Sequence, residues 1–162
     1  MDAIVVGTGT VLADDPHLTA RDEDGRLADR QPLRVVVGDR EIPRDAHVLD
    51  SVAETLLLPG GDPHAILETL AARGIVDVLL EGGPRLAGAF VAASRVDRVL
   101  AYLAPALLGS GPAALGDAGV GSISQAWWLD IEETTMSGPD VRVSAVPKAQ
   151  APVAKGPSAT GR

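Results

Sequence analysis

The strongest constraint on the fold is a repeated pattern: a short apolar run, rich in β-branched residues, that ends at a turn bearing glycine or proline. The pattern occurs at residues 3–7, 33–38, 55–58 and 76–80. Continuous apolar runs of this length are typical of strands buried on both faces, as in the parallel sheets of α/β proteins. The sequence therefore predicts four buried strands.

Two helical segments alternate with these strands. Asp62 and Pro63 supply a cap and a first-turn proline for the first helix, which ends at Gly74, and Pro84 opens the second. Their apolar faces carry Ile66, Leu67, Leu70 and Ala71 in the first helix and Leu86, Ala87, Phe90 and Val91 in the second. A further strand at 97–104 follows. This order predicts an α/β fold with a mainly parallel sheet, right-handed crossovers and flanking helices.

The rest of the chain carries weaker patterns. Residues 8–32 form a long polar stretch that we interpret as a functional or mobile loop. Residues 105–126, rich in Gly, Ala and Ser, indicate a second loop with at most a short helical turn. Strands at 127–136 and 140–146 are predicted to form an antiparallel hairpin, and the apolar-poor segment 147–162 is predicted to be a disordered tail.

Composition excludes several functions. The formal net charge of −8 and the scattered basic residues disfavour nucleic acid as a partner. The chain has no cysteine, which excludes thiolate metal sites, and its three histidines show no ligand spacing, so no metal is predicted. No apolar run is long enough to span a membrane, and no basic region follows Met1. We therefore expect a cytoplasmic protein.

The first candidate site is the glycine turn that follows the opening strand. Gly7 and Gly9 allow backbone amides to approach a nucleotide closely, and Thr10 and Asp14 add a hydroxyl and a carboxylate. The third glycine of the dinucleotide fingerprint is absent, because Leu12 stands in its place. The motif alone therefore leaves open a purely local turn without a ligand.

The second candidate site is the segment 78–85, where a strand runs through Gly82 and Gly83 into the start of a helix. Unpaired amides at a helix N-terminus favour an anion such as a diphosphate. Glu81 stands at the end of the strand, where a buried carboxylate needs a partner or a polar ligand. The alternative is a tight strand–helix joint that Glu81 caps.

Charged residues of the long loop are further candidates. Arg21, Arg26, Arg30 and Arg34 can each bind a substrate phosphate through the guanidinium group, or can simply be solvated. His17 either titrates near neutral pH beside the acidic pair 14–15 or is exposed without a role. The pattern identifies no catalytic acid or base.

With these residues identified, two long segments show a family resemblance. Residues 2–21 (DAIVVGTGTVLADDPHLTAR) and 79–111 (LLEGGPRLAGAFVAASRVDRVLAYLAPALLGSG) resemble the reductase domain of bacterial riboflavin biosynthesis, typically the C-terminal half of a bifunctional deaminase/reductase. The closing segment 136–146 (MSGPDVRVSAV) is similar to that family's last hairpin. The resemblance implies a dihydrofolate-reductase-like fold, with residues 1–146 as one reductase domain.

The resemblance also implies an activity: NADPH-dependent reduction of 5-amino-6-(5-phosphoribosylamino)uracil to the ribitylamino product. By motif position, the implied cofactor-binding residues are Thr10, Asp14, Gly83, Pro84, Arg85, Leu86, Ala87, Gly88 and Ala89. The implied substrate-binding residues are Leu18, Arg21 and Glu81. A homodimer is plausible for this family.

Two departures from the family pattern stand out. Asp39 occupies a position where the family often has serine, and its carboxylate is expected to repel the 2′-phosphate of NADPH. A complete domain also begins with a strand, a Trp-bearing loop and a helix that this sequence does not show, so the first strand and helix are expected to be missing. Two alternatives therefore remain: an NADPH reductase of another heterocycle, or a non-catalytic remnant.

Overall fold

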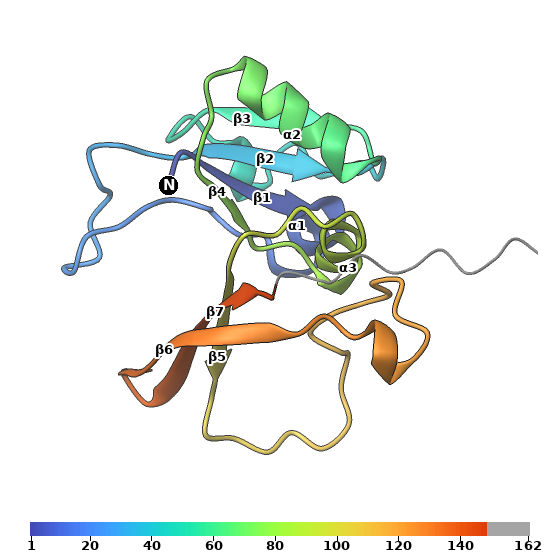
Figure 1. Ribbon diagram of the computed structural model, residues 1–162. Helices are drawn as coiled ribbons and strands as arrows, with labels where there is room; N and C mark the ends of the chain where they lie inside the picture. Colours follow the sequence, from blue (N-terminus) through green and yellow to red (C-terminus); the bar gives the residue numbers. More distant parts are fainter. Residues whose placement is uncertain (149–162) are drawn as a thin grey trace, which may run out of the picture. The chain divides into compact units, whose positions relative to one another are not determined.

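A computed structural model describes residues 1–148 and divides the chain into two units (Figure 1). Unit 1 consists of Met1–Arg95 and Ser110–Val120, and unit 2 consists of Val96–Gly109 and the residues from Gly121 onward. The prediction of one domain over 1–146 stays a prediction. Of the predicted tail 147–162, Pro147 ends a strand, and residues 149–162 lie outside the described residues.

Unit 1 contains a four-stranded parallel sheet. Its strands are β1 (Ala3–Gly7), β2 (Leu33–Val37), β3 (Thr55–Leu58) and β4 (Val78–Leu80), in the order β3-β2-β1-β4. The predicted strands and their parallel pairing are confirmed. β4 is shorter than predicted, because the amides of Val76 and Asp77 donate hydrogen bonds to the Asp2 carboxylate instead of joining a ladder.

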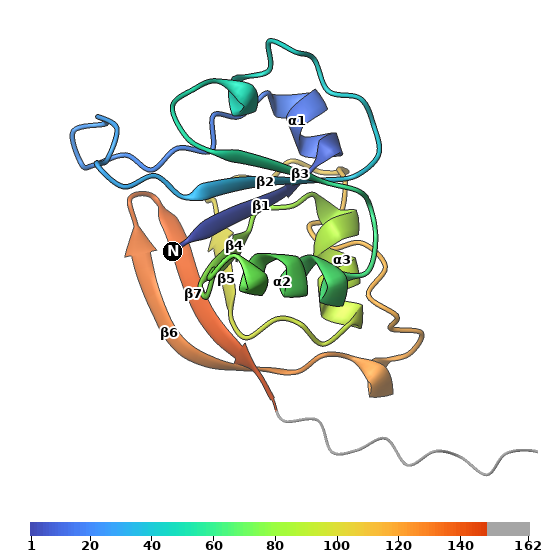
Figure 2. The same ribbon diagram turned by 90° about the horizontal axis from the view of Figure 1, so that it is seen from above.

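Helices lie on both faces of this sheet. Figure 2 shows α1 (Thr8–Asp14) on one face, with the short 3-10 turn η1 (His47–Leu49). The other face carries α2 (Pro63–Ala72) and α3 (Pro84–Ala92). Asp62 caps α2 as predicted, since its carboxylate accepts the amide of His64 at 3.1 Å. Successive side chains of each strand point to opposite faces of the sheet, so alternate residues face α1 on one side and α2 and α3 on the other.

This alternation of side chains produces the core of unit 1. Val6 and Val36 pack with Val11 of α1 and with Val48 of η1. Their strand neighbours point to the opposite face, where α2 buries Ile66 and Leu70 and α3 buries Phe90. The two central strands are therefore covered on both sides, which explains their continuous apolar runs.

The interpretation of residues 8–32 as a loop throughout was wrong at its start, because residues 8–14 form α1. Seven residues that include glycine and β-branched types have weak helix propensity, so the local pattern gave no helix signal. Burial of Val11 holds the helix against the sheet, and Asp15, with φ 41°, ends it in the left-handed region.

Unit 2 contains a three-stranded antiparallel sheet. Its strands are β5 (Val99–Leu103), β6 (Leu129–Ser137) and β7 (Asp140–Pro147), in the order β5-β7-β6. The predicted hairpin is confirmed, and the short turn η2 (Ile123–Gln125) lies in the predicted loop 105–126. The expectation that the strand at 97–104 continues the parallel sheet was wrong, because β5 pairs antiparallel with β7. Strand–helix order alone does not specify which later strand becomes the partner.

No helix within residues 1–148 has the length and apolar character needed to cross a membrane.

Candidate functional site

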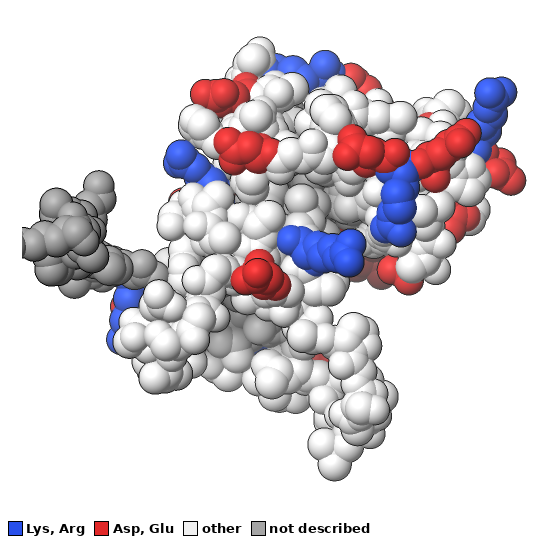
Figure 3. Space-filling model, turned by 90° about the vertical axis from the view of Figure 1, so that its right-hand side faces the viewer, with Lys and Arg blue, Asp and Glu red and all other residues white. Residues whose placement is uncertain are grey.

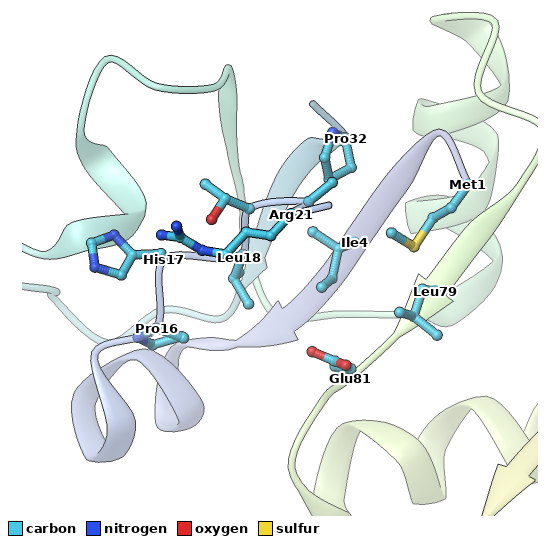
Figure 4. Close-up of a pocket in the computed structure, with 11 residues that line it drawn as sticks. Met1, Ile4, Pro16, His17, Leu18, Arg21, Pro32, Leu79 and Glu81 are labelled. Atoms are coloured by element: carbon cyan, nitrogen blue, oxygen red, sulfur yellow. The ribbon is translucent and has the colours of Figure 1, made fainter. Parts of the chain in front are cut away.

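A cavity of about 410 Å³ lies in unit 1 (Figure 4). That volume is within the usual range for small-molecule sites. Ile4 and Leu79 are register partners on β1 and β4, and they supply apolar surface from the sheet. The full lining is Met1, Ile4, Pro16, His17, Leu18, Thr19, Ala20, Arg21, Pro32, Leu79 and Glu81. All three predicted substrate residues, Leu18, Arg21 and Glu81, are therefore brought together.

The loop wall of this cavity is held at both ends by side chains. The Arg34 guanidinium donates to the carbonyl of His17 at 3.3 Å. The Gln31 amide donates to the carbonyl of Ala20 at 3.0 Å and accepts its N–H at 2.9 Å. Between these anchors Leu18 has φ 50°, a left-handed conformation that a branched residue rarely adopts. The fold thus fixes the loop in a shape that its local sequence does not favour.

The four arginines proposed as phosphate ligands have different environments. Arg34 is completely buried, and its guanidinium binds Asp50 at 2.8 Å and the carbonyls of His17, His47, Asp50 and Ala53. The suggestion that Arg34 binds substrate phosphate was therefore wrong. Arg26 and Arg30 are exposed and pair with Asp24 and Asp2. Only Arg21 of the four lines the cavity.

Glu81 differs from its predicted surroundings. Its amide donates to the carbonyl of Val5 at 3.0 Å, which continues the β1–β4 ladder, but its side chain is exposed. Its carboxylate has no hydrogen-bond or ion-pair partner among residues 1–148 and lies at the edge of the cavity in Figure 4. The carboxylate is therefore available to a ligand.

His17 belongs to a cluster that the sequence pattern did not reveal. Its ring stacks on that of His47, with ring centres 4.1 Å apart and an angle of 24° between the planes. Each ring lies beside a carboxylate, His17 at 3.7 Å from Asp50 and His47 at 3.0 Å from Asp15. The hydrogen bond from Arg34, followed by that from the Val52 amide, lowers the pKa of Asp50. The pairing joins segments 30 residues apart, so no local signal indicates it.

The two glycine turns meet at Thr10. The Thr10 hydroxyl lies 3.6 Å from the position that a Cβ on Gly83 would take, an ordinary contact distance. Asp14 follows Thr10 by four residues on α1 and therefore lies on the same helix face. Gly83 is the N-cap of α3, and no side chain caps that end. The turn thus presents amides beside a hydroxyl group.

The other predicted cofactor residues lie on α3. The carbonyl of Pro84 accepts the amide of Gly116 at 2.9 Å, and Gly88 is buried against the backbone of Asp117. Leu86 packs over Gly82, while Arg85 is exposed and Ala87 and Ala89 are half-buried. Gly88 thus has a packing role in the structure, and contact of the segment 83–89 with a cofactor stays a prediction.

Charge on this molecule is locally balanced. On the face drawn in Figure 3, basic and acidic side chains lie close to one another. Most arginines of residues 1–148 that form ion pairs do so at the surface, such as Arg73 with Glu54 and Arg98 with Glu132. Among residues 1–148 no ion pair is formed by Arg21, Arg40, Arg44, Arg85 or Arg95.

Comparison with known proteins gives a consistent family. The model of the RibD C-terminal domain matches residues 1–143. Riboflavin biosynthesis protein RibD of Mycobacterium tuberculosis (strain H37Rv) is 52% identical over 145 residues, which cover 90% of this chain and 42% of that protein. The 2,5-diamino-6-ribosylamino-4(3H)-pyrimidinone 5′-phosphate reductase of Archaeoglobus fulgidus is 33% identical over 67% of this chain and 64% of its own length.

The solved structures agree. RibD of Acinetobacter baumannii superposes with a TM-score of 0.75 at 26% identity, over 90% of this chain and 46% of that one. This chain thus spans less than half the length of the two RibD proteins described here. The family match at residues 1–143 nevertheless extends over nearly all the described residues, including both glycine turns, and ends within β7 of the closing hairpin. The chain belongs to the RibD C-terminal domain family.

Proposed function

We propose that the chain is a reductase that uses NADPH to convert 5-amino-6-(5-phosphoribosylamino)uracil to its ribitylamino product. The observation that carries this proposal is the shared cavity: Leu18 and Arg21 from the loop after α1 and Glu81 from the end of β4 line one space of about 410 Å³. The printed names of the relatives support the class of reaction, since the protein of Archaeoglobus fulgidus is a ribosylaminopyrimidinone phosphate reductase.

The chemistry of the lining suits such a substrate. The exposed Arg21 guanidinium can bind a phosphate bidentately. The unpartnered Glu81 carboxylate can accept N–H groups of an aminopyrimidine. Leu18, Ile4 and Leu79 offer apolar surface to the ring. A phosphorylated aminopyrimidine therefore has a complementary group for each of its parts.

The geometry around the predicted cofactor residues supports the binding of a dinucleotide. The Thr10 hydroxyl lies beside Gly83, and α3, whose N-terminus has no side-chain cap, begins at the same point. When bound, NADPH supplies the hydride that reduces C1 of the opened sugar. Thr10, Asp14 and the turn from Gly83 to Ala89 would hold and orient it.

The test follows NADPH oxidation by the chain with the phosphoribosylaminopyrimidine as substrate. Arg21→Gln is expected to raise KM roughly 10- to 100-fold with little change in kcat, because the phosphate lies away from the reacting carbon and its binding contributes equally before and in the transition state. The matched control is Arg26→Gln, an exposed arginine of the same loop that pairs with Asp24 and does not line the cavity. An Arg21→Gln variant with unchanged KM would contradict the assignment.

The same assay separates the two alternatives. Turnover of dihydrofolate in place of the pyrimidine would favour a reductase of another heterocycle. In a fluorescence titration, the absence of saturable NADPH binding would favour a non-catalytic remnant that has lost its site, and saturable micromolar binding would exclude it. A cytoplasmic location and a homodimer belong to the same proposal, and light scattering of the purified chain tests the dimer.

A further inference from the structure

The substrate loop, residues 15–21, supplies one wall of the cavity, and the short turn η1 contacts this loop from the side away from the cavity. We propose that His47, the first residue of η1, is a positioning residue for substrate binding that acts through its bond to Asp15. This inference rests on the proposed function and deepens it, because that function assigns Leu18 and Arg21 to the substrate but does not say what holds their loop in place.

The substrate loop has a conformation that its own residues disfavour. Asp15 has φ 41° and Leu18 has φ 50°, so two residues other than glycine lie in the left-handed region close together in sequence. Such conformations cost energy and persist only where the surrounding structure imposes them. The shape in which Leu18 and Arg21 line one cavity therefore depends on contacts from other segments.

His47 contacts Asp15 through both its backbone and its ring. The His47 amide donates to the Asp15 carboxylate at 2.9 Å. Ring Nδ1 lies 3.0 Å from the carbonyl oxygen of Asp15 and 3.0 Å from a carboxylate oxygen of the same residue. Both oxygens are acceptors, so Nδ1 carries a proton and donates it. One histidine thus holds the backbone and the side chain of a residue in a left-handed conformation.

His47 also supports the residue of the loop that reaches the cavity. Its ring stacks on that of His17, which lies at the edge of the cavity in Figure 4. The Arg34 guanidinium donates to the carbonyls of His17 and His47, each at 3.3 Å. Arg34 therefore links the backbones of the two stacked residues, and the stack aligns the His47 ring with the loop.

The support on which His47 stands is fixed independently of the substrate loop. Val48 is completely buried in the core of unit 1. Asp50, which follows η1, accepts the buried Arg34 guanidinium at 2.8 Å. A partly exposed pair such as His47 and Asp15 contributes little where both partners are mobile, because ordering them costs entropy. Here the turn is already ordered, so the bond can be used to hold the loop.

The experiment compares two substitutions of His47 that each remove one of its contacts. His47→Asn places an amide nitrogen at the position of Nδ1 and keeps the bond to Asp15, whereas His47→Phe keeps a ring for stacking and loses the bond. His47→Phe is expected to raise KM for the phosphoribosylaminopyrimidine roughly 5- to 20-fold and to change kcat less than about twofold, because a loop that adopts its binding shape less often lowers the apparent affinity in proportion. His47→Asn should stay within about threefold of the parent chain in both constants.

The matched control is His64→Phe, the same substitution at an exposed histidine of α2 that pairs with Glu68 and lies outside the cavity lining. It is expected to leave KM and kcat unchanged. Amide hydrogen exchange of peptides from residues 15–21, measured without substrate, should be faster in His47→Phe and unchanged in His47→Asn and His64→Phe. Circular dichroism establishes that each variant folds, and His47→Leu, which also lacks the donor, replaces His47→Phe if that variant does not.

The other outcomes overturn the inference. Unchanged KM and unchanged exchange in His47→Phe would show that the loop does not depend on His47. An equal rise of KM in His47→Asn and His47→Phe would show that the bond to Asp15 is not the contact that matters. A fall in kcat at constant KM would contradict a positioning role. If the parent chain does not reduce the pyrimidine, the proposed function fails, whereas hydrogen exchange still decides whether His47 holds the loop.

Discussion

The two units of this chain bury their side chains to different degrees. In unit 1 the central strands β1 and β2 are buried on both faces, and every buried apolar residue of the described core except Ala145 belongs to this unit. In unit 2 nearly all of β6 is exposed, and large apolar side chains such as Ile131 and Leu108 are in contact with solvent. Apolar sequence alone therefore does not make a core, because burial requires covering elements on the sheet.

The polar groups differ in the same way. Arg34 of unit 1 is inaccessible and binds four backbone carbonyls and a carboxylate, whereas Arg98 of unit 2 is half exposed and binds Glu132 and the Ser144 hydroxyl. The candidate site lies in unit 1, beside the buried network. The candidate site therefore lies in the unit whose residues are more completely buried.

The largest expected effect on stability comes from replacing Arg34, in comparison with Arg98. Arg34→Met should lower the free energy of unfolding by about 4 kcal/mol, because it leaves Asp50 and several carbonyls without their partner. Arg98→Met, which breaks an exposed pair, should cost less than about 1 kcal/mol. Urea unfolding followed by circular dichroism measures both values. Similar costs for the two variants would contradict the contrast between the units.

The two tryptophans allow the same unfolding experiment to follow unit 2 separately. Trp127 and Trp128 both belong to unit 2, so their fluorescence reports that unit separately. If Arg34→Met shifts the circular dichroism transition and the fluorescence transition together, the two units unfold cooperatively; if only the former shifts, they unfold independently.

The next effect concerns apolar contacts. Leu70 on α2 is 1% exposed, and Leu70→Ala should cost about 3 kcal/mol through lost burial and a residual cavity. Leu108 in unit 2 is 91% exposed, and Leu108→Ala should change stability by no more than about 0.5 kcal/mol. The same unfolding assay compares them. A cost above that limit for Leu108→Ala would show that its side chain is covered in solution.

The smallest expected effect on stability is that of protonating Asp50 and Asp2, and it is confined to acid pH. Hydrogen bonds from Arg34 and Val52 lower the pKa of Asp50, and those from the Asp77 and Val76 amides lower the pKa of Asp2. A lowered pKa in the folded state contributes stability that is present above the unfolded-state pKa of about 4 and is lost as the pH falls through the folded-state pKa. Stability between pH 5 and neutrality should therefore not depend on these two protonations.

Asp50→Asn should make the loss of stability below about pH 4 less steep, because one proton-linked group is removed. The measurement is the unfolding free energy as a function of pH, with each Asn variant first compared with the parent chain at pH 7 to establish that it folds. If the unfolding free energy of both Asp50→Asn and Asp2→Asn falls with decreasing pH as steeply as that of the parent chain, other carboxylates control acid unfolding.

Much of unit 1 was predictable because its signals are local. The four apolar runs, the Asp62-Pro63 cap and the Gly82-Gly83-Pro84 segment each lie within a few residues and specify strands and helix starts directly. The predicted substrate residues came from the resemblance, and the fold places Leu18, Arg21 and Glu81 on one cavity. Helix α1 was missed because burial of Val11, not propensity, holds it.

The sequence by itself determined which segments become strands and the family to which the chain belongs. Only the tertiary structure decided that β5 pairs with β7, that Arg34 is buried, and that His17 stacks on His47. The physical reason is distance along the chain. Local patterns record the conformation of a segment, whereas these contacts join segments far apart, and the order of strands in the sheet determines which of them meet.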